Sequence, residues 1–257
     1  YNSVKIIEVV NALEQFAPLP LQEDYDNAGL QVGLTEAEVS GALLCLDVTE
    51  TIVDEAIAKG CNLIVSHHPL IFRKLRRLTG DDYVQRTVMK AIEKKITIRS
   101  LHTNMDSVTG GVNFKIAEKM GLEQLSFLGK RQTVSLPCDT PDTCCGACRT
   151  VEGGEGIIGY LPMPMAADDF IIMLKQTFGV ECVMANELIR RDIRKVALCG
   201  GAGDFLLDEA LAAGADTFVT GEMRYHQFFG QEQQIQLAII GHYQSEQYTT
   251  EIFRDII

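Results

Sequence analysis

Continuous apolar runs alternate along the chain with stretches in which apolar residues are spaced as on one face of a helix. The runs lack the polar alternation of a half-exposed strand, so they predict strands covered on both faces. The clearest of these runs lies at 42–46, and further strands are predicted at 63–65 and 96–101, and again at 195–199, 217–219 and 237–240.

Helical spacing predicts helices between these runs. They are expected at 3–17, 49–60, 81–95, after Thr109 and at 167–178. Ser3 is expected to cap the first helix and Thr49 the second. Strands joined through helices by short connections form right-handed parallel units. The predicted fold class is α/β, with mainly parallel strands.

One strand–helix–strand stretch occurs twice. Residues 45–69 align without a gap on 199–223, so that Asp54-Glu55-Ala56 falls on Asp208-Glu209-Ala210. The chain is therefore expected to consist of two duplicated α/β halves related by pseudo-symmetry. The predicted segments of this single structural unit are a first half at 1–128, a connecting segment at 129–192 and a second half at 193–257.

The connecting segment is less regular than the two halves. A Gly-rich turn is expected at 152–156, a short strand at 156–161 and the helix at 167–178. We expect this segment to add antiparallel strands to a sheet edge.

Histidines and carboxylates follow four of the predicted strands. All five histidines of the chain lie in the two halves, and ligands bind beyond the carboxyl ends of parallel strands. A His-x-x-x-acid pattern occurs in each half. The candidate ligands are His67, His68, His102, Asp106, His242 and Glu246.

Five or six ligands are too many for one four-coordinate zinc ion, so they indicate two ions that share a carboxylate and a water. Nitrogen and oxygen ligands without thiolate suit Zn, Mn, Fe or Co, and the sequence does not choose among these. Such a pair would supply a bridging hydroxide near neutral pH and polarise the bond under attack.

Further residues border this site, and each has two interpretations. Glu222 and His226 either move protons or orient metal-bound histidines. The turn formed by Gly200, Gly201 and Gly203 is either a plain tight turn or a phosphate-binding turn. Asp26-Asn27 is either a turn device or reaches the site.

Composition restricts the class of protein. A formal charge of −12 argues against nucleic-acid binding, and the one basic cluster, 73–77, is a solvated face or a local anion contact. No apolar run reaches the ~18 residues of a membrane span, and no signal-peptide pattern opens the sequence. We expect a cytoplasmic protein with reduced cysteines.

Four cysteines lie close together in the connecting segment. They are Cys138, Cys144, Cys145 and Cys148. A Cys-x-x-Cys pair in a loop is able to hold zinc, but no second spaced pair follows it. An exposed, redox-prone loop is the favoured interpretation.

Several motifs together carry a family resemblance. They are YDNAGLQVG from Tyr25, LDVT from Leu46, SHHPLIF from Ser66, HTNMDSVTGGVN from His102, GIIGYL from Gly156, GGAGDF from Gly200, TGEMRYH from Thr220 and GHYQSE from Gly241. With them the chain resembles the Nif-three-like family, often labelled GTP cyclohydrolase I type 2 homologues. Two positions depart from the family pattern, since Tyr25 replaces a usual Trp and Glu222 a usual Asp.

The resemblance implies a dinuclear metal centre, with Glu246 as the bridge and His102 as a neighbour rather than a ligand. The implied ligands are His67, His68, Asp106, His242 and Glu246. It also implies a duplicated core and a homohexamer, built as a trimer of dimers, whose sites face an internal cavity.

The expected function is that of a dinuclear metal-dependent hydrolase. Its small-molecule substrate is expected to be a purine nucleotide, with a hydroxide opening the imidazole ring of GTP. The alternative is a non-catalytic metal-binding scaffold or metal-delivery protein that forms a ring-shaped oligomer. Ring opening of GTP or hydrolysis of phosphoesters would support the hydrolase. Tightly bound, slowly exchanging metal without turnover would support the scaffold or delivery protein.

Overall fold

The computed structural model describes residues 3–137 and 149–257, and the chain forms two compact units. The first unit comprises Tyr1–Met105 with Thr249–Ile257, and the second comprises Asp106–Tyr248. These limits differ from the predicted segment limits at 128 and 192. The difference arises because residues 106–128 form a helix and a strand that contact the later sheet.

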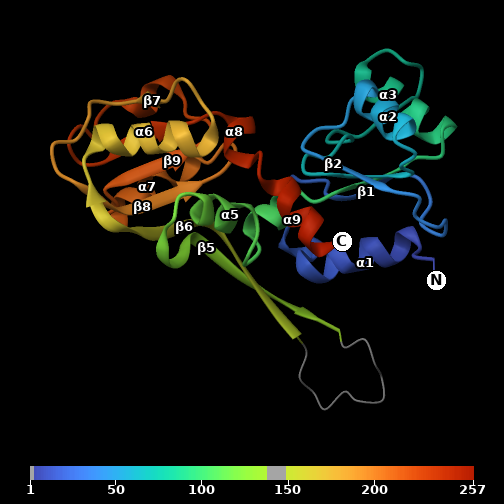
Figure 1. Ribbon diagram of the computed structural model, residues 1–257, viewed down its shortest axis with the longest axis horizontal. Coiled ribbons are helices and arrows are strands. Elements are labelled where there is room, and N and C mark those ends of the chain that lie inside the picture. The colour runs from blue at the N-terminus through green and yellow to red at the C-terminus, as the bar shows by residue number, and fades with distance from the viewer. Residues whose placement is uncertain (1–2, 138–148) are drawn as a thin grey trace. The chain divides into compact units, whose positions relative to one another are not determined.

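The first unit is a four-stranded sheet with helices on both faces. Its order is β1-β4-β3-β2, with β1 antiparallel to β4 and the remaining pairs parallel. Helices α2 and α3 cover one face, and α1 and α9 lie on the other (Figure 1). The elements are α1 (Ile6–Phe16), a 3-10 turn (Leu19–Leu21), β1 (Gly29–Val32), β2 (Ala42–Cys45), α2 (Glu50–Ala58), β3 (Leu63–Ser66), α3 (Tyr83–Glu93), β4 (Thr97–Ser100) and α9 (Thr249–Ile256).

The second unit is built on a six-stranded sheet of order β5-β6-β8-β9-β10-β7. Helix α7 packs on one face against a core that includes Phe218 and Leu237. The elements are α5 (Val112–Lys119), β5 (Glu123–Leu136), β6 (Arg149–Met165), α6 (Ala167–Phe178), β7 (Met184–Ala185), β8 (Ile193–Cys199), a 3-10 turn η3 (Asp204–Leu206), α7 (Leu207–Ala212), β9 (Thr217–Thr220), η4 (Tyr225–Phe228), β10 (Gln236–Ile239) and α8 (His242–Glu246). The short helix α4 (Thr103–Ser107) spans the limit between the units.

The duplication predicted from the sequence is present in the strand registers. In the first unit Cys45 of β2 pairs in parallel with Ser66 of β3, and in the second Cys199 of β8 pairs with Thr220 of β9. These are aligned positions of the repeat. In both units a third parallel strand follows, flanked by an antiparallel edge strand that precedes the repeat in sequence. The α/β fold class is therefore confirmed.

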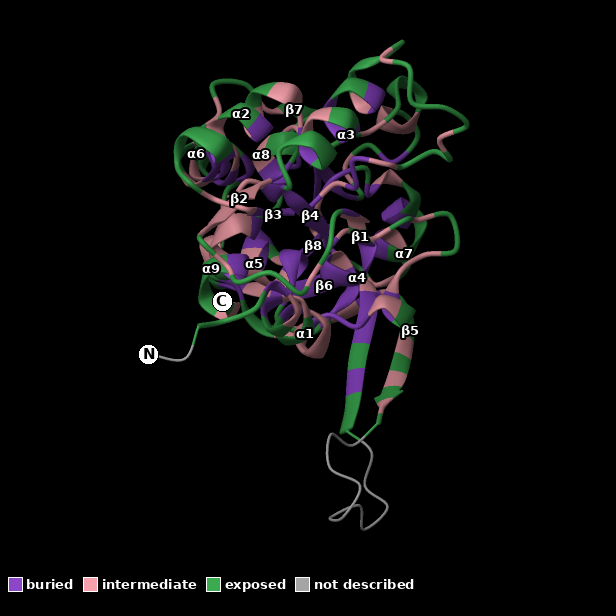
Figure 2. Ribbon diagram, turned by 90° about the vertical axis from the view of Figure 1, so that its right-hand side faces the viewer, coloured by how far each residue is buried: buried purple, intermediate pink, exposed green. Residues whose placement is uncertain are grey.

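The central strands are buried on both faces, whereas β2, for which the continuous apolar run at 42–46 predicts such burial, is only partly buried because it lies at the edge of its sheet. Every residue of β9 and β10 is buried. The same holds for β3 and β4 (Figure 2). The carboxyl ends of parallel strands covered in this way form the rim at which ligands bind in open α/β sheets.

The long hairpin of β5 and β6 corrects one sequence prediction. Residues 152–156 are part of β6 and form no turn. Their glycines allow close packing: a Cβ at Gly154 would collide with the ring of Phe127, and one at Gly156 would lie 2.8 Å from the carbonyl oxygen of Leu198. As predicted, the connecting segment adds antiparallel strands to the sheet, here beside β8 (Figure 1).

The two predicted helix caps have different outcomes. Thr49 caps α2 and accepts from the backbone N–H of Ile52, as expected. Ser3 does not cap α1, because the helix begins at Ile6 and Lys5 occupies the N-cap position. The Ser3 hydroxyl instead donates to the Glu38 carboxylate. Within the described residues no helix has both the length and the apolar character that crossing a membrane needs.

Candidate metal centre

Three histidines of the first unit gather beyond the carboxyl ends of two adjacent strands. His67 and His68 follow β3 directly, and His102 follows β4, which pairs in parallel with β3. One ring nitrogen of each lies within 4.8 Å of one ring nitrogen of the other two, a spacing at which they could hold a metal ion. The ring centroids of His67 and His68 are 4.8 Å apart, and each lies 5.4 Å from that of His102.

Each of these imidazoles is held through its Nδ1 atom by an oxygen. His67 Nδ1 lies 2.8 Å from the carbonyl oxygen of Leu101, His68 Nδ1 2.9 Å from Asp47 Oδ1, and His102 Nδ1 2.8 Å from Asp26 Oδ1. A carbonyl or carboxylate oxygen only accepts, so Nδ1 carries the proton in each ring. The lone pair of the neutral ring is then on Nε2. Histidines that bind metal through Nε2 are commonly held in this tautomer by an oxygen at Nδ1.

Asp26 therefore reaches the site, which decides between its two interpretations. Besides His102, its carboxylate accepts from the backbone N–H and the hydroxyl of Thr103. Burial raises the pKa of Asp26, but the hydrogen bonds from His102 and Thr103 outweigh burial and lower the pKa to about 2. Asp26 thus stays ionised and fixes the orientation of His102 and the start of α4.

In the second unit His242 and Glu246 face each other across one turn of α8. His242 Nε2 lies 3.2 Å from Glu246 Oε2, and His242 Nδ1 lies 2.8 Å from Glu222 Oε1. The hydrogen bond to Glu246 raises the pKa of His242, burial lowers it, and Glu222 raises it further, to about 9. A metal ion bound at Nε2 would take the place of a proton there.

Glu246 is also near the remaining candidate carboxylate of this unit. A ligand oxygen of Asp106 lies within 4.8 Å of one of Glu246. Glu246 is 3% exposed and therefore buried. Among the described residues of this unit, one buried carboxylate thus approaches both other proposed ligands, which is the arrangement a bridging carboxylate needs.

Gly201 explains how the chain makes room for this carboxylate. A Cβ at this position would lie 2.5 Å from Glu246 Oε1 and 3.3 Å from His242 Nε2. Its φ of +63° is also one that residues with a side chain rarely adopt. The glycine therefore permits close approach of the backbone to the proposed ligands.

The backbone N–H groups of this turn are engaged within the second unit. Gly200 donates to Asn113 Oδ1, Gly201 to the Ser245 hydroxyl, and Gly203 to the Thr220 hydroxyl, at 2.8–3.0 Å. A phosphate at the turn would have to replace these bonds. The geometry therefore favours the interpretation as a tight turn that positions the ligand helix.

Other candidate residues lie in different surroundings. His226 is exposed in η4, with its ring against Tyr225 at a centroid distance of 5.1 Å. Tyr25, at the position where the family pattern has Trp, is exposed. Cys138, Cys144, Cys145 and Cys148 lie outside the described residues. Burial raises the pKa of the Cys45 thiol to about 12 and raises the pKa of the Cys199 thiol further.

A model of the Duf34/NIF3 family (NGG1p interacting factor 3) matches residues 4–257. The chain belongs to the Duf34/NIF3 family. Two curated relatives are each named GTP cyclohydrolase 1 type 2 homolog. The one from Clostridium perfringens is 34% identical over 245 residues, which is 95% of this chain and 87% of the relative. The one from Clostridium acetobutylicum is 31% identical over 246 residues, 95% of this chain and 86% of the relative.

Solved structures share the fold. A Staphylococcus aureus hypothetical protein matches with a TM-score of 0.84 and 28% identity, over 98% of this chain and 90% of the other. A Bacillus cereus protein related to NIF3 matches with a TM-score of 0.85 over 100% of this chain and 94% of the other. At 24% identity, the latter shows the fold alone. The sequence resemblance of this chain to the Nif-three-like family is thereby confirmed.

Three features of this Duf34/NIF3 site were not identified from the sequence. They are the Asp47 carboxylate on His68, the Leu101 carbonyl on His67 and the steric role of Gly201. Asp47 does carry a sequence signal, because it follows β2 at the same rim of the sheet as the histidines. The carbonyl of Leu101 carries none.

Proposed function

We propose that this protein is a dinuclear metal-dependent hydrolase whose ligands are His67, His68, Asp106, His242 and Glu246. The observation that carries the proposal is the set of Nδ1 anchors on the histidines. The three proposed imidazole ligands, His67, His68 and His242, each have an oxygen at Nδ1, which directs their Nε2 lone pairs to metal binding. An ordinary surface histidine needs no such partner.

The donor set fits Zn, Mn, Fe or Co, because it consists of imidazole nitrogens and carboxylate oxygens. When bound, two such ions would supply hydroxide near neutral pH and polarise the bond to be hydrolysed. His102 holds the chain at the start of α4 through Asp26, so its role is to position Asp106, three residues further along that helix.

Glu222 is a positioning residue for His242 in this proposal. Its carboxylate accepts from Nδ1 and favours the tautomer that presents Nε2. His226, exposed beside Tyr225, is the group that remains for proton transfer to and from solvent.

The proposed substrate is a purine nucleotide, in which water opens the imidazole ring at C8. Support comes from the names of the relatives, GTP cyclohydrolase 1 type 2 homolog, and from a site suited to activate water. We also propose that the protein acts in the cytoplasm as a homohexamer, in which six chains of 28.4 kDa would give about 170 kDa by sedimentation.

The test is to load metal-free protein with each of the four metals and incubate it with GTP and a panel of phosphoesters. Ring-opened and formylated products are followed by mass spectrometry. We expect turnover with GTP that disappears in His68→Ala, while circular dichroism shows the fold intact. Absence of turnover with every metal and substrate, together with slowly exchanging metal, would instead establish the scaffold or delivery role.

A further inference from the structure

A basic loop in the first unit follows directly from the histidine pair. After His67-His68 the chain passes Leu70 and Phe72 and then reads Arg73-Lys74-Leu75-Arg76-Arg77. Four of five residues are thus cationic in a chain with a formal charge of −12. All four basic residues are exposed, and none forms an ion pair with any described residue.

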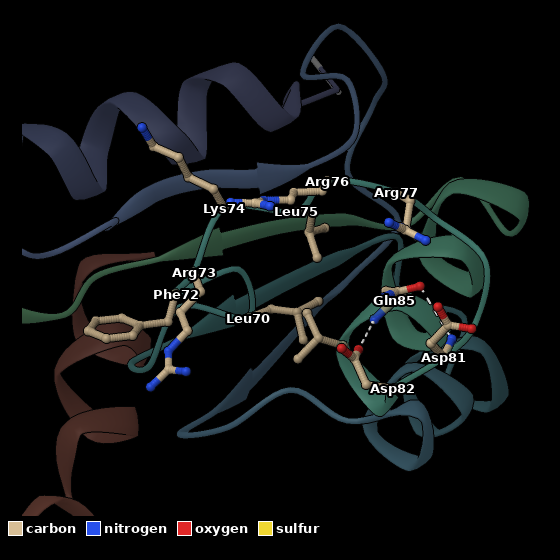
Figure 3. Close-up of a pocket in the computed structure, with 11 residues that line it drawn as sticks. Leu70, Phe72, Arg73, Lys74, Leu75, Arg76, Arg77, Asp81, Asp82 and Gln85 are labelled. Carbon is tan, nitrogen blue, oxygen red and sulfur yellow. Dashed lines mark hydrogen bonds between the residues drawn. The ribbon is translucent and has the colours of Figure 1, made fainter.

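These side chains line a pocket of about 330 Å³. Leu70 and Leu75 form part of its wall, and the first turn of α3 closes it (Figure 3). Apolar walls lower the local dielectric and strengthen the attraction between a cation and a bound anion. Figure 3 shows the side chains of Arg73 and Arg77 at different ends of the drawn pocket, which suits an extended anion better than a single small one.

The two acidic residues that line the pocket are already engaged. Asp82 accepts from the backbone N–H of Gln85 at 2.8 Å and so caps α3, and Asp81 accepts from the Thr79 hydroxyl at 2.8 Å. Gln85, which is 9% exposed, accepts from the backbone N–H groups of Thr79 and Asp81. The far end of the loop is thus fastened to α3, and the cationic side chains keep a net excess of positive charge.

The pocket is connected to the histidines within the same unit. Phe72 lines the pocket, and its ring meets that of His102 edge-on at a centroid distance of 6.3 Å. The Asn27 side chain donates to the carbonyl oxygen of Ile71 at 2.6 Å, which holds the segment between His68 and Phe72. One ligand is therefore able to have an anionic end in the basic pocket and another group near the histidines.

We propose that this pocket binds the phosphate tail of a phosphorylated small molecule whose reacting group lies at the histidines. The proposal rests on the hydrolase function above and specifies its substrate class, since a polyphosphate has the extended charge that Arg73 to Arg77 match. Arginine favours phosphate because its planar fork of donors bonds phosphate oxygens in pairs.

The experiment is isothermal titration calorimetry on metal-free protein with inorganic triphosphate, GTP and guanosine, at low and high salt. One variant changes Arg73, Lys74, Arg76 and Arg77 to Gln. The control variant changes four exposed basic residues that form ion pairs elsewhere: Lys59, Lys94, Arg190 and Arg254. Each variant has 19 basic residues against 35 acidic ones, so both have a formal charge of −16.

We expect triphosphate and GTP to bind, guanosine to bind far more weakly, and affinity to fall with salt. The loop variant should lose about tenfold or more in affinity for triphosphate, which corresponds to at least about 1.4 kcal/mol. The control variant should stay within about twofold of the wild type. Equal losses in both variants, equal binding of guanosine and GTP, or tighter binding of single-stranded RNA than of triphosphate would each overturn the proposal.

This test is independent of the hydrolase test because it involves neither metal nor turnover. A failure to bind triphosphate leaves the metal-dependent activity open to its own assay. Conversely, a protein that binds triphosphate but shows no turnover retains the pocket and loses the hydrolase proposal.

Discussion

At the scale of single residues, Gly201 combines two properties that substitution can separate. Its positive φ disfavours any side chain, and its missing Cβ leaves room for Glu246 Oε1. We predict that Gly201→Ala displaces the Glu246 carboxylate and weakens binding of divalent ions by about tenfold or more, a loss of at least about 1.4 kcal/mol. Calorimetric titration of the metal-free protein with Zn²⁺ and Mn²⁺ measures this change.

Gly179 provides a matched control for this substitution. It has the same φ of +63°, but nothing lies within 4 Å of the position that its Cβ would take. Gly179→Ala should therefore cost about 1 kcal/mol of stability through backbone strain and leave metal affinity unchanged. Equal metal affinities in the two alanine variants would show that Glu246 does not bind metal where the structure places it.

Asp26 gives a prediction for the dependence of stability on pH. Its pKa is about 2 in the folded protein and near 3.8 in the unfolded chain. A depressed pKa stabilises the fold above the unfolded value, and this contribution disappears as the pH falls through the folded value. We expect wild type to be more stable than Asp26→Asn at pH 6, by about 1–2 kcal/mol after allowance for solvent screening.

Urea unfolding of both proteins at pH 6, 4, 3 and 2 measures that difference. It should persist down to about pH 4 and shrink between pH 4 and pH 2. If the difference in stability did not depend on pH over this window, the hydrogen bonds of the ionised Asp26 carboxylate to His102 and Thr103 would make no net contribution to stability.

The sequence predicts the proposed ligands better than it predicts the groups that hold those ligands in place. Proposed ligands such as His67 and His242 are found because imidazole after a buried strand is rare and the pattern recurs. Support from Asp47 or from the carbonyl of Leu101 depends on which atoms meet in space, and residue types alone do not encode it. The sequence leaves two interpretations open for Asp26 and for the Gly200 turn. Hydrogen bonds between residues up to 87 positions apart distinguish them.

At the scale of elements, buried strands are predicted well and the hairpin is not. Strands β3 and β9 appear where their short apolar runs lie and are buried on both faces, whereas the apolar strand β2 is only partly buried because it lies at a sheet edge. The sequence predicts a turn at the glycines of β6, because glycine favours turns locally. The reason for glycine in β6 instead lies on another strand. Phe127 of the neighbouring strand β5 occupies the space that a side chain at Gly154 would need.

This packing predicts the effect of a substitution at Gly154. Its Cβ would collide with the Phe127 ring, and overpacking of this kind costs about 1–3 kcal/mol. We expect Gly154→Ala to lower the free energy of unfolding by that amount. In a double-mutant cycle, Phe127→Leu should recover part of the loss, because the smaller side chain makes room for the methyl group. Additive effects in urea unfolding would show that the two residues do not compete for space.

At the scale of the whole molecule, the duplication explains why the site residues recur. Each unit repeats the same parallel pairing, Cys45 with Ser66 and Cys199 with Thr220. Each also continues after its third parallel strand into a short helix that ends near an acidic residue, Asp106 in one case and Glu246 in the other. Duplication of one strand–helix module therefore accounts for two His-x-x-x-acid sequences without separate origins for each.

The distribution of ligands over the repeats leads to a prediction about metal stoichiometry. If Glu246 bridges the two ions, its loss removes a ligand from both, whereas the loss of His67 removes a ligand from one. We expect about two ions per chain in the wild type, about one in His67→Ala and almost none in Glu246→Ala, as measured by elemental analysis after dialysis. His226→Ala is the control, and it should keep both ions because His226 lies exposed against Tyr225. Retention of one ion by Glu246→Ala would show that this carboxylate serves a single ion and that another group bridges the pair.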